Sequence, residues 1–376
     1  MARKKKIGIV YNYNENWIGG TYYIENLLAA LGTLDEKDRP QVFVVSKSKE
    51  SYEALQKKVP YPNLQWLNVF SFSLSERIIN KIGRILLKKP LIDKRVRGLD
   101  IIFPLFRAES SVHPGQPSLF WIPDLQEHFF PAFFTQEELA ARRAWHQDMI
   151  DQKGKILFSS KAARNDFVSV YPGAGTTNYV VPFAVTHQPY DQLSIETLRA
   201  KYELPPVYFM SPNQFWVHKN HKVLINAAAE LKKAGEEVVI ALTGKPYDSR
   251  KPEYYQELLD LTQANGLEKN IRFLGFIDRQ EQLQLMNHAR AIIQPSKFEG
   301  WSTVIEDAKA MNQFVLASDI PVHLEQAPNG VFFNPDDPSM LAGLLKQYSA
   351  VQPERSTTDY RTHVRKFAAD FLNTID

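Results

Sequence analysis

The chain contains no cysteine among its 376 residues. Disulfide bridges and thiolate metal sites are therefore excluded, and the composition is typical of a reducing compartment. The chain also lacks an apolar run of about 18 residues, the length that a membrane-spanning helix needs. The N-terminal letters M-A-R-K-K-K lead straight into a short apolar segment, so we expect no secretory signal and a cytoplasmic location.

An excess of charge of one sign is also missing. The 45 basic and 42 acidic side chains give a formal net charge of +3, which is too small to indicate a nucleic-acid partner. Hydrophobic residues make up 44% of the sequence, which is enough for packed interiors. The length exceeds the about 100–200 residues of a typical domain, so the sequence predicts a globular protein of two domains.

Short apolar segments alternate with helical patterns along the chain, as a parallel α/β sheet requires. The segments form two series, at 7–11, 42–45, 101–103, 119–122, 156–158 and 179–181, and then at 207–210, 238–242, 271–274, 291–293 and 314–317. Helical periodicity separates them, most clearly at 221–233, 254–264, 280–289 and 303–311. We therefore predict two Rossmann-like, doubly wound domains that face a central cleft. Residues 1–185 and 186–355 would form the domains, and a helix within 356–376 would pack back toward the first.

Residues 295–310 read P-S-K-F-E-G-W-S-T-V-I-E-D-A-K-A and are the most informative part of the chain. The apolar run at 291–293 predicts a buried strand just before them, and Gly300 ends that strand. Ser302 and Thr303 then offer the chemistry of a helix start. The free N–H groups of such a helix, together with the positive end of its dipole, favour a bound phosphate.

Two carboxylates, Glu299 and Glu306, flank this loop. Carboxylates beside a phosphate site suit the hydroxyls of a sugar or ribose, so the segment predicts a nucleotide that carries a sugar. Thr303-x-x-Glu306 is also the spacing of a capping box, in which Glu306 would satisfy its own helix terminus and contact no ligand. Both interpretations can hold, because a carboxylate accepts more than one hydrogen bond.

The second half of the chain resembles the donor domain of the GT-B glycosyltransferases, specifically the retaining glycosyltransferase family four (glycosyl transferases group 1). The resemblance rests on the block at 295–310 and on Lys219 in W-V-H-K-N-H. The segments L-T-G-K at 242–245, R-F-L-G-F at 272–276 and S-D-I-P-V-H-L-E-Q at 318–326 also match. In the first half, G-G-T-Y-Y-I-E-N-L resembles the family's glycine pair, and W-I-P-D-L-Q resembles its H-D-L strand end.

This resemblance implies transfer of a sugar from a nucleotide diphosphate sugar to an acceptor hydroxyl with retention, in polysaccharide or glycoconjugate biosynthesis. In the implied catalytic set, Lys219 faces the leaving diphosphate and Glu299 orients the sugar. Asp124 is the third member, with helix capping as its alternative role. The implied donor-binding residues are Gly19, Gly20, Asn213, Gly244, Gly300, Trp301, Ser302, Thr303 and Glu306. The acceptor would be a saccharide or a lipid-linked molecule.

Three positions depart from the family pattern. Six residues lie between Glu299 and Glu306, where the family usually has seven. The arginine that usually precedes the lysine is missing, and Asn213 or Gln214 stands in its area. Pro123 replaces the histidine of the H-D pair. These departures keep open the alternative of a non-catalytic sugar or nucleotide binding protein. A sugar epimerase or a phosphorylase of the same architecture is a second alternative.

The sequence offers little for a metal. It shows no D-x-D pair that would clamp a divalent ion on the diphosphate, and His218 and His221 have no third ligand nearby in the sequence for zinc. We therefore expect metal-independent transfer without a cofactor, in which protein cations and helix N-termini stabilise the leaving group.

Residues 77–97 carry eight basic side chains and one acid, Asp93. The apolar side chains of this stretch fall on one helical face, namely Ile78, Ile79, Ile82, Ile85 and Leu86, and the basic residues lie largely beside it. Such a helix could lie on the inner face of an anionic membrane, which would imply a lipid-linked acceptor. An amphipathic helix packed on its own sheet has the same pattern, and we favour that second interpretation.

Overall fold

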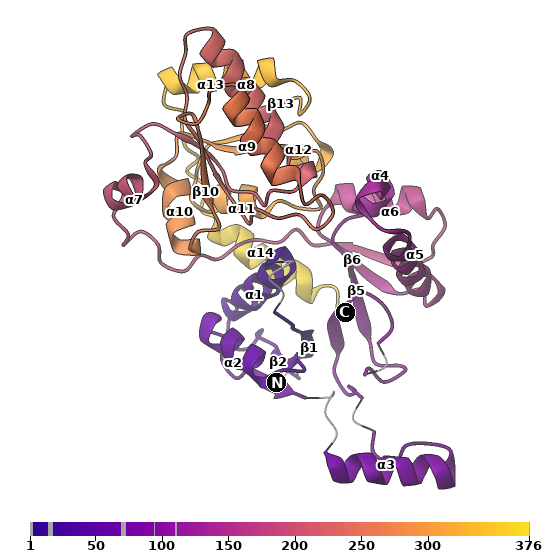
Figure 1. Ribbon diagram of the computed structural model, residues 1–376. Coiled ribbons are helices and arrows are strands. Elements are labelled where there is room, and N and C mark those ends of the chain that lie inside the picture. The colour runs from indigo at the N-terminus through magenta and orange to yellow at the C-terminus, as the bar shows by residue number, and fades with distance from the viewer. Residues whose placement is uncertain (1–2, 14–17, 69–72, 94, 110, 376) are drawn as a thin grey trace.

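The computed structural model describes residues 3–13, 18–68, 73–93, 95–109 and 111–375. They form two parallel β-sheets with helices packed around each, as the sequence predicts (Figure 1). Residues 14–17, shortly before the glycine pair, lie outside the described residues.

The N-terminal sheet has seven strands in the order β3-β2-β1-β4-β5-β6-β7. The strands are β1 (Lys6–Val10), β2 (Gln41–Val45), β3 (Gln65–Leu67), β4 (Ile101–Leu105), β5 (Ser118–Ile122), β6 (Lys155–Phe158) and β7 (Thr177–Val180). The helices are α1 (Ile18–Gly32), α2 (Lys49–Lys58), α3 (Leu74–Leu87), α4 (Gln126–Phe129), α5 (Gln136–Asp151) and α6 (Lys161–Val170). The central strands are apolar on both faces, because helices cover a parallel sheet from both sides.

The C-terminal sheet has six strands in the order β10-β9-β8-β11-β12-β13. The strands are β8 (Phe209–Ser211), β9 (Ile240–Thr243), β10 (Ile271–Gly275), β11 (Ile292–Gln294), β12 (Val315–Ser318) and β13 (Val331–Phe333). The helices are α7 (Ile195–Tyr202), α8 (His221–Lys233), α9 (Tyr254–Ala264), α10 (Arg279–His288), α11 (Thr303–Ala310), α12 (Pro321–Gln326) and α13 (Pro338–Ala350). A 3₁₀ turn at Val217–Lys219 precedes α8.

Each sheet reverses its strand order at one point, where the chain crosses from one half of the sheet to the other. In the N-terminal sheet this point lies between β1 and β4, and in the C-terminal sheet it lies between β8 and β11. Ligands of doubly wound sheets bind outside the carboxyl ends of the strands at this point. The fold therefore predicts a ligand site at the segments that follow β1, β4, β8 and β11.

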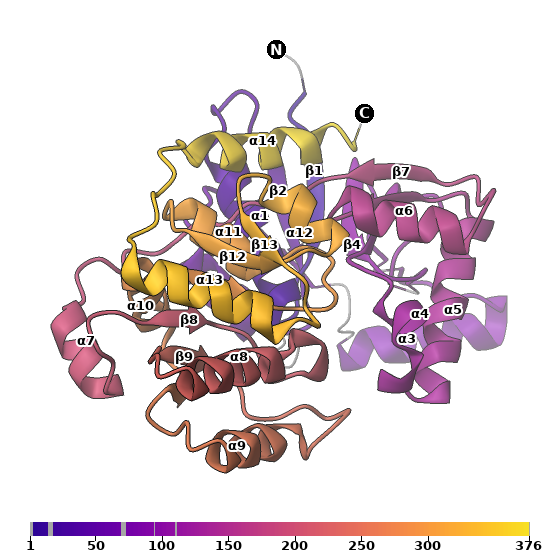
Figure 2. The same ribbon diagram turned by 90° about the horizontal axis from the view of Figure 1, so that it is seen from above.

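The last helix, α14 (Arg361–Leu372), packs back on the N-terminal domain, as expected (Figures 1 and 2). Its buried side chains, Val364, Phe367, Ala368 and Phe371, belong to one core with residues of α1 and β4. The ring of Phe367 meets that of Tyr23 edge-on, at 5.5 Å between centroids. The C-terminal segment is thus part of the N-terminal core.

Helix α3 contradicts the interpretation that we favoured for residues 77–97. Figure 1 shows it standing apart from both sheets, and its apolar side chains are exposed instead of covering its own sheet. The amphipathic pattern gave the helix correctly but could not tell which surface covers its apolar face. No described helix is both long enough and apolar enough to cross a membrane.

Candidate active site

A cleft of about 1070 Å³ lies between the two domains. Segments that follow β1, β4, β5, β8, β9 and β11 contribute to its walls. The predicted site residues line this cleft, with the exception of Glu306. Two sheets that meet carboxyl end to carboxyl end thus bring together residues that lie far apart in the sequence.

Asn213 and Glu299 lie at the reversal point of the C-terminal sheet. Asn213 follows β8, and its amide nitrogen donates to Gln294 Oε1 on β11 at 2.9 Å. Gln294 in turn donates to Glu299 Oε1 at 2.7 Å, and the Ser296 hydroxyl donates to the same oxygen at 2.7 Å. The two strand-end loops are therefore joined by a chain of side-chain hydrogen bonds.

Lys219 completes this network. Its ammonium lies 2.6 Å from Glu299 Oε1, and only 13% and 10% of the two side chains are exposed. Burial alone would raise the pKa of Glu299, but the Lys219 charge and the hydrogen bonds of Lys219 and Ser296 outweigh it, so the pKa is lowered. Glu299 is thus held ionised at neutral pH.

The loop after Glu299 contacts the N-terminal domain closely. A Cβ placed on Gly300 would lie 2.1 Å from the carbonyl oxygen of Pro123. A Cβ on Gly244 would likewise lie 2.3 Å from the carbonyl oxygen of Asn213. Both contacts are too short for any side chain, so glycine at these positions permits close backbone approach beside the cleft.

Helix α11 begins differently from the expected capping box. Ser302 is the N-cap and its hydroxyl accepts from the Ile305 N–H, whereas Thr303 is the first helical residue. The Ser302 N–H, expected to face a phosphate, donates to Gln326 Oε1 at 2.9 Å. Ser302 and Thr303 both line the cleft, but the Ser302 N–H is already used, so the phosphate interpretation of this helix start now depends on the N–H of Thr303.

Glu306 faces the protein interior, contrary to expectation. Only 1% of it is exposed, and its carboxylate accepts from Lys309, Gln326 and the Tyr360 hydroxyl. Tyr360 precedes α14, so Glu306 helps to fix the returning C-terminal segment. Its contacts give it a structural role.

The neighbouring acid, Asp307, lines the cleft instead. Its Oδ1 accepts from Arg279 at 2.6 Å and lies 2.9 Å from His187 Nε2. Its Oδ2 is buried and has no hydrogen-bond partner among the described residues. Burial raises the pKa of Asp307, but Arg279 and His187 outweigh this and lower it. Seven residues separate Asp307 from Glu299, so the spacing expected from the family resemblance was present in the sequence and we missed it.

The N-terminal wall holds the other predicted residues. Gly19 and Gly20 lie in the first turn of α1, and a Cβ on Gly19 would meet nothing within 4 Å. Asp124 accepts from the Gln126 N–H at 3.0 Å, although Leu125 is the N-cap of α4 and Asp124 does not occupy the capping position considered above. Burial raises the pKa of Asp124, while the hydrogen bond from the Gln126 N–H and the charge of Arg142 oppose that effect. Arg250 of the other domain donates to Gln126 at 3.0 Å across the cleft.

Residues 194–364 match the family model described as glycosyl transferases group 1. This range includes β8 to β13 and the complete loop between β11 and α11. The match takes in nearly the whole C-terminal domain, which is called the group 1 domain below.

Two curated glycosyltransferases are similar to parts of this chain. D-inositol 3-phosphate glycosyltransferase of Corynebacterium diphtheriae is 24% identical over 231 residues, which cover 58% of this chain and 53% of that protein. O-antigen chain mannosyltransferase RfbU of Salmonella typhimurium is 29% identical over 142 residues, which cover 37% of each chain. The matches therefore span about half, or less, of the length of these relatives.

Solved structures resemble the whole chain, including the part outside the group 1 domain. A glycosyltransferase from Rickettsia africae has a TM-score of 0.62 at 17% identity, and the match covers 100% of this chain and 95% of that one. HepE from Anabaena, solved with UDP and glucose, has a TM-score of 0.63 at 16% identity over 99% and 96% of the chains. These likenesses establish the expected GT-B fold.

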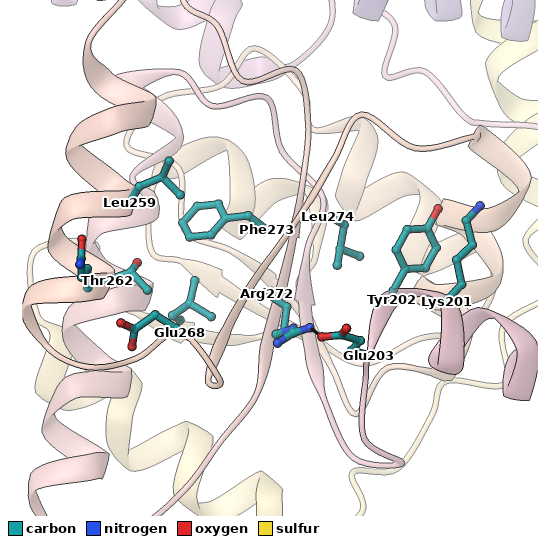
Figure 3. Close-up of a pocket in the computed structure, with 11 residues that line it drawn as sticks. Lys201, Tyr202, Glu203, Leu259, Thr262, Glu268, Arg272, Phe273 and Leu274 are labelled. Carbon is teal, nitrogen blue, oxygen red and sulfur yellow. Dashed lines mark hydrogen bonds and ion pairs between the residues drawn. The ribbon is translucent and has the colours of Figure 1, made fainter.

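A second hollow, of about 610 Å³, lies on the group 1 domain (Figure 3). It is lined by residues of α7, α9 and β10, and the ion pair between Arg272 and Glu203 lies in it. None of the predicted site residues is among its described lining residues. The described part of the chain also contains no cluster of three or more His, Cys, Asp or Glu residues that could hold a metal ion. The interdomain cleft is therefore the candidate active site.

Proposed function

We propose that the protein transfers a glycosyl group from a nucleotide diphosphate sugar to an acceptor hydroxyl, with retention, in polysaccharide or glycoconjugate biosynthesis. The observation that carries the proposal is the contact between Gly300, in the donor loop of the group 1 domain, and Pro123 of the other domain. A donor bound to one domain faces an acceptor bound to the other across this contact. The curated relatives named above are both glycosyltransferases, which supports the same activity.

In this proposal Asp307, not Glu306, binds the ribose. Its unpartnered Oδ2 is an acceptor that a ribose hydroxyl would satisfy, and its place on α11 lies beside the donor loop. Glu299 accepts hydrogen bonds from the sugar hydroxyls. The complex of HepE with UDP and glucose supports UDP as the first nucleotide to test.

The chemical step breaks the bond between the sugar C1 and the diphosphate oxygen and forms a bond from C1 to the acceptor oxygen. The acceptor proton passes to the departing phosphate on the same face, which is the route that the family resemblance implies. Negative charge grows on the leaving diphosphate. Lys219 and the N–H group of Thr303 stabilise it without a metal, because fixed cations and dipoles act strongly where water is excluded.

The acceptor is a saccharide or a lipid-linked molecule, and the second class would require the protein to lie at a membrane. Its binding surface is the N-terminal wall of the cleft, which includes Trp145 and Arg142. The reaction takes place in the cytoplasm, a location that the absence of cysteine supports.

A thermal-shift panel of UDP, GDP, ADP and TDP with their common sugars tests donor binding. A ligand at about 100 times its Kd adds about 2.7 kcal/mol to stability. The donor found in this way is then incubated with and without candidate acceptors. A transferase forms a glycosylated product and free nucleotide only when an acceptor is present. An isomerised sugar without any acceptor would indicate an epimerase, and binding without turnover would indicate a binding protein.

A further inference from the structure

Helix α3 presents an apolar face to solvent. Between 46% and 76% of each of five side chains on this face is exposed, namely Leu74, Ile78, Ile82, Ile85 and Leu86, and Ile79 beside them is 39% exposed. At 3.6 residues per turn, these six residues fall within an arc of about 140°. Monomeric proteins rarely expose a continuous apolar strip of this kind, so the face needs a partner.

The other side of the helix packs on the segment that directly follows it. The Asn80 amide donates to the Ile92 carbonyl at 3.0 Å and accepts from the Ile92 N–H at 2.7 Å. A Cβ on Gly83 would lie 2.6 Å from Leu91, so the chain after the helix packs tightly against it. A capping box between Ser73 and Glu76 fixes its first turn. These contacts therefore leave the apolar face of α3 uncovered.

Cations lie beside this face and at the C-terminal end of the helix. Lys81, Arg84, Lys88 and Lys89 are exposed. The two acids within residues 73–93 are engaged, because Glu76 accepts from the Ser73 N–H and Asp93 pairs with Arg95 at 2.6 Å. A helix with an apolar face and a basic rim is suited to the boundary between acyl chains and anionic head groups.

We propose that α3 docks the protein on the surface of an anionic lipid bilayer. The apolar side chains enter the acyl boundary, and the basic side chains contact lipid phosphates. Pairing with a second copy of the chain is the weaker alternative, because two α3 faces packed together would bring their basic edges close to each other. The positive charge beside the apolar face therefore favours an anionic bilayer over a second copy of the chain.

The docking surface is connected to the wall of the cleft. A few residues after the α3 anchor, the Val96 N–H donates to the Ser111 carbonyl at 2.8 Å, and the His113 N–H donates to the Val96 carbonyl at 3.0 Å. Ser111 and Val112 line the cleft. A docked membrane would therefore lie near the N-terminal wall of the cleft, where the acceptor is proposed to bind. This location favours a lipid-linked molecule as the acceptor. That last step, unlike the docking, rests on the proposed transferase function.

Vesicle flotation of the full chain tests the docking. We expect binding to vesicles that contain phosphatidylglycerol, little binding to phosphatidylcholine alone, and loss of binding as salt shortens the Debye length to about 3 Å at 1 M. Replacing Ile82→Asp and Ile85→Asp together should lower the partition coefficient at least about tenfold. Replacing Lys81→Gln, Arg84→Gln and Lys88→Gln should lower it about a hundredfold.

Matched controls use equally exposed residues elsewhere. Val351→Asp, on the C-terminal domain, and a triple change of Lys57→Gln, Lys233→Gln and Lys269→Gln should leave vesicle binding within about twofold. The thermal shift with the donor should be the same in all these proteins, so it reports on the proposed function separately. Absence of vesicle binding, equal loss in variants and controls, or a dimer in light scattering that Ile82→Asp breaks would each overturn the proposal.

Discussion

The Lys219 ammonium lies 2.6 Å from the Glu299 carboxylate at the reversal point of the C-terminal sheet. Gln294 and Ser296 donate hydrogen bonds to the same carboxylate oxygen, so this oxygen accepts from three side chains. A sugar hydroxyl that binds this oxygen would therefore compete with Lys219, Gln294 and Ser296. The ion pair of Lys219 and Glu299 therefore stabilises the loop after β11 and also fixes the position of the Lys219 charge in the cleft.

Replacing Lys219→Ala should lower the free energy of unfolding by about 3 kcal/mol at pH 7, because it leaves the Glu299 carboxylate buried without its cation. The same change should abolish the thermal shift with the donor. Urea unfolding of parent and variant measures the first effect. Lys222→Ala is the matched control, since its ion pair with Glu257 is exposed and should contribute less than about 1 kcal/mol.

The difference between parent and Lys219→Ala should depend on pH. The pKa of Glu299 is lowered in the folded protein, so the pair contributes its full stability above the ordinary glutamate pKa of about 4.3. That contribution is lost as the pH falls through the lowered pKa, because both proteins then hold a neutral Glu299. A difference that stays constant between pH 7 and pH 3 would contradict the role given to this ion pair.

The sequence predicts the long periodic elements well and the short edge strands poorly. Helices α8 and α9 begin and end where the 3.6-residue pattern does. Strands β3 and β13 were missed, because each has three residues and forms only through its ladder with β2 or β12. Their conformation is set by the neighbouring strand, which local periodicity cannot report.

The candidate site was also predicted in part. Strand ends are visible in sequence, and a parallel sheet brings them to one edge, so the cleft residues can be named. The choice between the adjacent acids Glu306 and Asp307 depends on the phase of α11. Neighbouring helical residues point about 100° apart, so one position decides which acid faces the cleft. The face of α3 was misassigned because amphipathicity does not identify the partner surface.

Asp307→Asn and Glu306→Gln should separate nucleotide binding from structure. The first should raise the nucleotide Kd at least about tenfold, since a hydrogen bond to a charged group is worth about 1.5–3 kcal/mol. The second should leave the Kd unchanged and lower stability by about 1–3 kcal/mol, because Glu306 binds Lys309, Gln326 and Tyr360. Calorimetric titration with UDP, or with the nucleotide that the panel selects, measures both. The reverse result would return the ribose role to Glu306.

Phe367→Ala should destabilise the N-terminal domain although the residue lies near the end of the chain. Its side chain is 1% exposed and packs against Tyr23 of α1. Truncating a buried phenylalanine costs about 3–5 kcal/mol. Scanning calorimetry should show a lower unfolding temperature, whereas Phe276→Ala, at a side chain that is 61% exposed, should change stability by less than about 0.5 kcal/mol. Equal effects of the two changes would argue against a shared core of α1 and α14.

Gly300→Ala should damage the contact on which the proposed function depends. The new Cβ would lie 2.1 Å from the Pro123 carbonyl oxygen, so the donor loop must move away from the N-terminal domain. We expect a loss of about 1–3 kcal/mol in stability and at least a tenfold fall in turnover. Gly343→Ala is the control, because its Cβ would meet nothing within 4 Å on an exposed turn of α13 and should stabilise that helix by about 0.5–1 kcal/mol. If Gly300→Ala keeps the parental turnover, contact between the donor loop and Pro123 is not required, and the two domains act without the close approach that the structure shows.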